Sequence, residues 1–126
     1  MAALSSYTPI ATTTLSSAGT VTFSSISGSY TDLVLVASAK SNVATENTWI
    51  RVGNSSIDTT TSYSHTILDA DGTTVRSTRQ SNISRIDTGW YVSPATNFGT
   101  TVIYFNNYSN TSSYKSILVR ENSIGS

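Results

Sequence analysis

Histidine and serine are the residues with which this chain could carry out nucleophilic catalysis, and it has a single histidine, His65. A nucleophilic triad needs a serine that is activated by a histidine, which a carboxylate in turn orients. Serines are numerous, but no G-x-S-x-G turn is present to hold one of them in a reactive position. His65 stands between Ser64 and Thr66 in an alternating stretch that is typical of a half-exposed strand. We therefore expect a protein without enzyme activity.

Carboxylates could bind a metal ion or act in pairs, but the seven acidic residues are scattered along the chain. Only Asp69-Ala70-Asp71-Gly72 resembles the start of a calcium loop. The glutamate that such a loop requires at its last position is replaced here by Gln80. A single histidine and the absence of cysteine also exclude the usual structural zinc sites. We expect no metal and no other cofactor, and we interpret Asp71-Gly72 as a hairpin turn.

Aromatic residues beside polar ones are the candidates for a binding surface. Trp90 and Tyr91 follow Asp and Thr residues, whereas Tyr108 and Tyr114 flank a run of Asn, Ser and Thr. Aromatic rings next to amide and carboxylate groups suit a protein interface, and they also suit a sugar ring. Burial in the core is the competing interpretation for the tryptophans. The candidate interface residues are Leu4, Tyr7, Trp90, Tyr91, Tyr108 and Tyr114.

The composition favours a neutral surface that is rich in hydroxyl groups. Seven Lys and Arg residues balance seven Asp and Glu residues, and charged residues make up only 11% of the chain, against roughly 25% in ordinary soluble domains. No cluster of basic residues is present to bind phosphates, so we expect no nucleic-acid partner. Neutral surfaces repel one another weakly, which suits a protein that packs beside copies of itself. We expect a homo-oligomer.

The chain carries no sequence signal for a membrane. Its first residues have neither the basic start nor the apolar run of a signal peptide. The longest apolar stretch, Leu33 to Ala37, is too short to cross a bilayer. We expect synthesis in a cytoplasm and no membrane partner. The 126 residues fit one domain over residues 9–126, with residues 1–8 extending from it as an arm.

The elements that must position these residues have the period-two pattern of strands. Thr20 to Ser24 alternates apolar and polar residues, and Leu33 to Ala37 is apolar on both faces, as in a central strand that is covered on each side. Further strands are expected over residues 49–52, 64–68, 73–79, 100–105 and 116–120, and no stretch has the pattern of a helix. Turn residues recur every 8 to 12 residues or so, which is typical of sandwiches and barrels. We predict an all-β fold, an antiparallel β-sandwich of about eight strands with jelly-roll topology. The expected core residues are Val21, Phe23, Leu33, Leu35, Ile50, Ile67, Ile103, Phe105 and Leu118.

Two parts of the chain resemble a known family. The first contains Ala11 to Ser17 and Tyr30 to Val36, and from Thr12 to Val36 it has the pattern "TTTLSS…VTFSSI…YTDLVLV". The second is "NYSNTSSYKS" from Asn107 to Ser116. This pattern is similar to that of small, Ser/Thr-rich β-sandwich proteins among the virion structural proteins of tailed bacteriophages, cyanophages in particular.

The resemblance implies a decoration or cement protein that is located in the virion and stabilises the capsid shell. Its partners would be the major capsid protein or other virion proteins. The alternative is a tail-fibre or receptor-binding module, in which Trp90 and Tyr91 would contact glycans.

Overall fold

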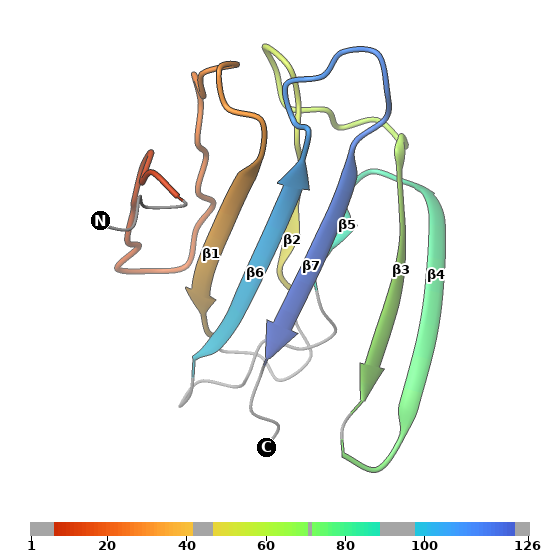
Figure 1. Cartoon of the computed structure of the whole chain (residues 1–126). Coiled ribbons are helices and arrows are strands. Elements are labelled where there is room, and N and C mark those ends of the chain that lie inside the picture. Colours follow the sequence, from red (N-terminus) through yellow and green to blue (C-terminus); the bar gives the residue numbers. More distant parts are fainter. Residues whose placement is uncertain (1–6, 42–46, 71, 89–97, 123–126) are drawn as a thin grey trace, which may run out of the picture.

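The computed structural model describes residues 7–41, 47–70, 72–88 and 98–122, and these ranges contain strands and no helix (Figure 1). The predicted all-β, antiparallel fold is confirmed. The described ranges contain seven strands, and the jelly-roll topology with about eight strands stays a prediction. The seven strands are β1 (Leu33–Ala39), β2 (Trp49–Ile50), β3 (Tyr63–Ala70), β4 (Val75–Ile83), β5 (Ile86–Asp87), β6 (Gly99–Asn106) and β7 (Ser116–Asn122).

The largest unit is a three-stranded antiparallel sheet in the order β1-β6-β7. Its register places Leu35 opposite Ile103, and Ile103 opposite Val119. The other strands form two antiparallel ribbons, β2–β5 and β3–β4. β-branched Val, Ile and Thr residues are frequent in the sheet, and their stiff side chains favour extended backbone.

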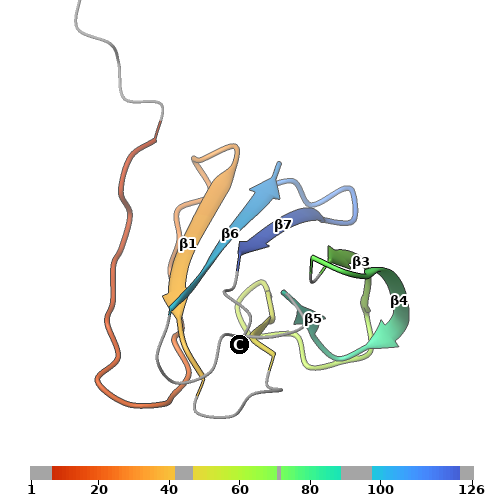
Figure 2. The same ribbon diagram turned by 90° about the horizontal axis from the view of Figure 1, so that it is seen from below.

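The elements are arranged in layers, as in a sandwich. Figures 1 and 2 show the β2–β5 ribbon on one face of the three-stranded sheet, which we call the inner face, and the β3–β4 hairpin beside β7. Side chains alternate between the faces of a strand, and Ile103, on the inner face, is only 2% exposed. On the β2–β5 ribbon, the side chain of Ile86 is buried and that of Ile50 is half-buried. The inner face also carries Leu33, Leu35, Phe105, Ile117, Val119 and Glu121.

The β3–β4 hairpin has the turn that the sequence predicts. β3 ends at Ala70 and β4 begins at Val75. Within the turn Gly72 has a φ of 86°, a conformation that glycine adopts without the steric cost of a Cβ atom. Figure 1 shows the hairpin extending away from the other strands at this end.

Three of the expected core residues lie elsewhere. Val21 and Phe23 are exposed, because residues 20–24 form no strand and their pattern finds no partner strand. Leu118 is 51% exposed, since the register of β7 turns Ile117 and Val119 inward instead. The expected strand pattern was correct for β7, but its assignment to the two faces was wrong.

The core is small for a chain of this length. Only three large apolar or aromatic side chains among the described residues are buried, those of Tyr63, Ile86 and Ile103. The chain exposes 9600 Å², whereas a compact monomer of this mass exposes about 6500 Å². Many large apolar side chains among the described residues are exposed.

Candidate interface

The first part of the exposed apolar surface is the segment of residues 7–25, which we call the N-terminal segment. All of its described side chains are exposed and none of its residues belongs to a strand. Figures 1 and 2 show it on the β1 side of the sheet. An extended segment that buries so little gains no core stability to offset its ordering entropy. Its large exposed apolar side chains are Tyr7, Ile10, Leu15, Val21 and Phe23.

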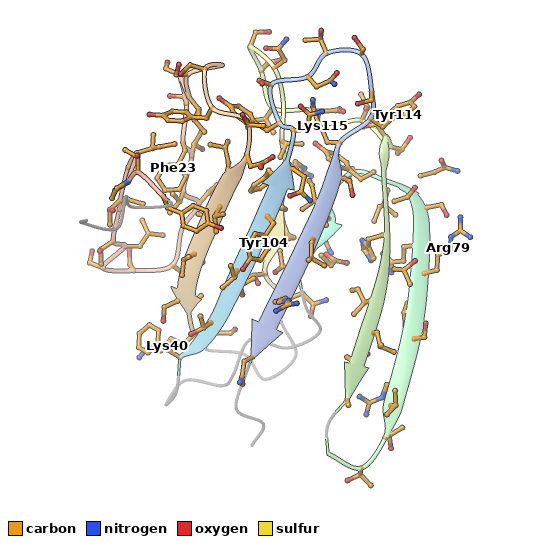
Figure 3. All side chains as sticks on the ribbon, viewed as in Figure 1. Phe23, Lys40, Arg79, Tyr104, Tyr114 and Lys115 are labelled. Carbon is orange, nitrogen blue, oxygen red and sulfur yellow. The ribbon has the colours of Figure 1, made fainter. Side chains whose placement is uncertain are left out.

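The second part is the face of the three-stranded sheet turned away from the β2–β5 ribbon, which we call the outer face. Val36 is paired with Val102, and Tyr104 (labelled in Figure 3) with Leu118, so apolar side chains adjoin across all three strands. Val36 is 66% exposed. The outer positions of these strands include a single charged residue, Arg120. An apolar sheet face without a covering layer is typical of a surface that binds another protein.

A shallow depression extends the outer face toward the end of β1. It is lined by six residues, among them Phe98 and Val102. The Nζ atom of Lys40 lies 5.1 Å from the centre of the Phe98 ring, a cation–π contact that holds an exposed aromatic side chain in place. The complete lining is Phe98, Thr100, Val102, Arg120, Glu121 and Asn122.

The loop between β6 and β7 is the third part, and it is held by hydrogen bonds. The backbone N–H of Asn107 donates to Oδ1 of Asp32 at 2.6 Å, and that of Tyr108 donates to the carbonyl of Thr31 at 3.0 Å. The Nζ atom of Lys115 donates to the carbonyls of Asn107 and Asn110. A loop that is fixed in this way presents its side chains at little further entropic cost.

The predicted interface residues divide into three groups. Leu4, Trp90 and Tyr91 lie outside the described residues. Tyr7 is exposed on the N-terminal segment.

Tyr108 and Tyr114 share the β6–β7 loop. Tyr114 is fully exposed (Figure 3). Tyr108 is half-buried, and its hydroxyl is enclosed without a hydrogen-bond partner in the described structure.

The outer face was missed by sequence reasoning, although its signal was present. The run Leu33 to Ala37 is apolar on both faces, and we interpreted it as a strand covered on each side. Within the described residues the β2–β5 ribbon covers the face that carries Leu33 and Leu35, whereas on the other face Val34 is half-buried and Val36 is exposed. The second apolar face is therefore a candidate surface for contacts with another protein.

His65 and Asp58 lie outside this surface. His65 is half-buried on β3, where it is paired with Gln80, and its Nδ1 atom has no hydrogen-bond partner in the described structure. Asp58 accepts hydrogen bonds from Ser62 and Thr60, which lower the pKa of its carboxyl group. No group of three His, Cys, Asp or Glu residues within the described ranges could hold a metal ion.

Comparisons with protein-family models, with curated proteins and with solved structures found no match. The described ranges contain no helix that is long and apolar enough to cross a membrane. The outer face, the N-terminal segment and the β6–β7 loop are therefore the candidate functional surfaces of the chain.

Proposed function

We propose that this chain is a non-enzymatic structural protein that binds other protein subunits through its outer face and N-terminal segment. In keeping with the family that its sequence resembles, we assign it to the virion of a tailed bacteriophage, as a decoration or cement protein of the capsid. The observation that carries the proposal is the apolar outer face formed by Val34, Val36, Val102, Tyr104 and Leu118, on which Val36 and Leu118 are exposed.

The balance of exposed and buried surface supports an assembled state. Burying apolar area contributes about 25 cal/mol per Å², and the chain leaves large apolar side chains exposed on both the outer face and the N-terminal segment. Covering them with a neighbouring subunit would add to the small core that the chain forms alone. The partners we propose are the major capsid protein, other virion proteins and further copies of this chain.

A repeating shell also makes weak contacts sufficient. Each copy that binds beside another gains from the contacts of its neighbours, so that many modest interactions add up to firm attachment. The fully exposed ring of Tyr114 on the ordered β6–β7 loop is suited to anchor such a contact. Its exposure also favours the alternative, a receptor-binding module of the tail that contacts glycans.

The test is to add the purified protein to particles of its own phage from which it has been removed, and to map where it binds by electron microscopy. We expect many copies distributed over the shell, and weaker binding for Val36→Glu and Leu118→Glu. Leu68→Glu is the matched control, because Leu68 is also a large apolar residue and is more exposed than either of these two, but lies on the β3–β4 hairpin. Equal binding of the wild type and all three variants would contradict the outer face as the interface. A few copies confined to the tail would favour the receptor-binding module.

A further inference from the structure

The β2–β5 ribbon carries a cluster of side chains that neither the core nor the outer face uses. Its register places Trp49 opposite Asp87 and Ile50 opposite Ile86. Because Ile50 and Ile86 face the three-stranded sheet, alternation places Trp49 and Asp87 on the side turned away from it. Arg51 follows Ile50 and Arg85 precedes Ile86, so the two arginines come one position further along the same side.

The contacts within this cluster fix both arginines at the indole ring. The guanidinium carbon lies 4.7 Å from the centre of the Trp49 ring for Arg51 and 5.6 Å for Arg85. The Nε atom of Arg51 donates to the carbonyl of Ser84 at 2.8 Å, and the Nε atom of Arg85 donates to Oδ1 of Asp87 at 3.0 Å. Asp87 is itself buried. The guanidinium groups are thus oriented before any ligand arrives.

The same contacts leave binding capacity unused. Each arginine uses its Nε atom, and in the described structure the two terminal nitrogens of each guanidinium donate no hydrogen bond to the protein. Terminal guanidinium nitrogens are the donors that bind a carboxylate or sulfate with two parallel hydrogen bonds. Two arginines against one carboxylate also give the cluster a net positive charge. Like charges facing each other across a ribbon are unfavourable, and an anion between them removes the repulsion.

The indole adds a second recognition element. Trp49 is 41% exposed although two cations lie against its ring. Both arginines come from the same end of the ribbon, and the exposed part of the ring remains open to a ligand. A flat aromatic surface beside charged donors suits a sugar ring that stacks on the indole while its acidic group meets the arginines. A carboxylate group of a protein partner could bind the two arginines, but it would not use the exposed indole ring.

We propose that Trp49, Arg51, Arg85 and Asp87 form a binding site for an acidic saccharide, a sugar that carries a carboxylate or sulfate group. Asp87 positions Arg85, the two arginines bind the anion, and Trp49 supports the sugar ring. The site lies on the ribbon, across the sheet from the outer face (Figure 2), so that subunit binding and saccharide binding do not compete for the same surface. It is independent of the assignment to the capsid.

The experiment is calorimetric titration of the full chain with trigalacturonate, a sulfated oligosaccharide, a neutral oligosaccharide of the same length and an acidic peptide. We expect the acidic saccharides to bind at least about tenfold more tightly than the other two ligands, since a hydrogen bond to a charged group changes affinity by about that factor. The double variant Arg51→Gln/Arg85→Gln should lose this preference. Arg79→Gln, on the exposed side of β4, should bind as the wild type does.

Circular dichroism checks that each variant folds. If the double variant does not fold, the single variant Arg51→Gln takes its place. Trp49→Leu separates the two parts of the site, because it should weaken saccharide binding while both arginines remain. The proposal is overturned if the wild type binds no acidic saccharide at millimolar concentration. It is also overturned if the acidic peptide binds as tightly as the saccharides, or if the arginine variant keeps the wild-type affinity.

Discussion

At the scale of single residues, the hydroxyl of Tyr63 shows how one buried side chain organises a loop. It lies 2.8 Å from the carbonyl of Val52 and 2.9 Å from that of Asp58, and it accepts a hydrogen bond from the N–H of Val52 at 3.1 Å. Its single proton serves one carbonyl at a time. The loop between β2 and β3 is thereby attached to the first residue of β3.

Replacing Tyr63 with phenylalanine should therefore destabilise the fold. The ring would still fill its place and the carbonyl of Val52 would keep the N–H of Asp58, but the N–H of Val52 and the carbonyl of Asp58 would lose the Tyr63 hydroxyl. The expected cost is about 1–3 kcal/mol. Urea unfolding followed by circular dichroism measures this free energy. Tyr114→Phe is the control, because its ring is fully exposed and exposed substitutions stay within about 0.5 kcal/mol. Equal stability of the two variants would contradict the role assigned to the Tyr63 hydroxyl.

Glu121 is the one acidic residue at the inner face of the sheet. Burial raises the pKa of its carboxyl group above the ordinary value of 4.5, and hydrogen bonds from Thr101 and Thr88 offset this only in part. The distance from Oγ1 of Thr101 to Oε2 of Glu121 is 3.3 Å. A carboxyl group with a raised pKa in the fold favours the folded state while it is protonated. Its contribution is complete below pH 4.5 and is lost as the pH rises through the raised pKa.

The substitution Glu121→Gln should consequently stabilise the protein at neutral pH. The glutamine side chain would keep an oxygen for the Thr101 hydroxyl without carrying a charge into a half-buried position. The gain over the wild type should shrink as the pH falls and vanish below the ordinary pKa of glutamate. Thermal unfolding of both proteins at about pH 7 and about pH 4, on either side of that ordinary pKa, measures it. A difference that is constant with pH would show that the charge of Glu121 is not its cause.

At the scale of elements, the sequence predicts where the strands lie better than it predicts which face of each strand is covered. Period-two alternation located β3, β6 and β7, and the turn at Gly72 followed from local chemistry. β5 was not expected, because two residues are too few for a pattern. Which face of β7 is covered depends on its register with β6, and that pairing is decided by the other strands.

The candidate sites divide in the same way. Tyr108 and Tyr114 could be predicted as loop residues from the Asn/Ser/Thr run around them. The contact of Arg51 with Ser84 joins residues 33 positions apart, and only the pairing of β2 with β5 brings them together. The alternation over Thr20 to Ser24 satisfied the local rule for a strand, yet a strand also needs a partner for its backbone hydrogen bonds.

The two faces of β6 and β7 give a matched pair of substitutions at this scale. Ile103→Ala should cost about 2–5 kcal/mol, because it leaves a cavity at a fully buried position. Leu118→Ala, on the outer face of the adjacent strand, should cost less than about 1 kcal/mol in the isolated chain and should weaken its association with other subunits. Unfolding in urea gives both values, and sedimentation compares the association. Similar losses of stability for the two variants would mean that the register of β7 is wrong.

At the scale of the whole molecule, the distribution of charge separates the two surfaces that we propose. The chain has no net charge, and the outer positions of the three-stranded sheet carry only Arg120. The cluster at Trp49 contains two arginines that are held by hydrogen bonds and by the indole ring. Contacts at the outer face rest on the burial of apolar surface, whereas contacts at the cluster rest on charge.

High salt should therefore weaken binding at the Trp49 cluster and leave binding at the outer face intact. At about 1 M salt the screening length falls to roughly 3 Å, which weakens attraction between charges but leaves the burial of apolar groups intact. Particles or oligomers that are washed at this salt should keep the protein bound, while its affinity for an acidic saccharide should fall several-fold. Gel analysis of the washed particles and titration at low and high salt measure the two effects. Release of the protein at high salt would contradict an apolar interface, and saccharide binding that does not change with salt would contradict recognition by Arg51 and Arg85.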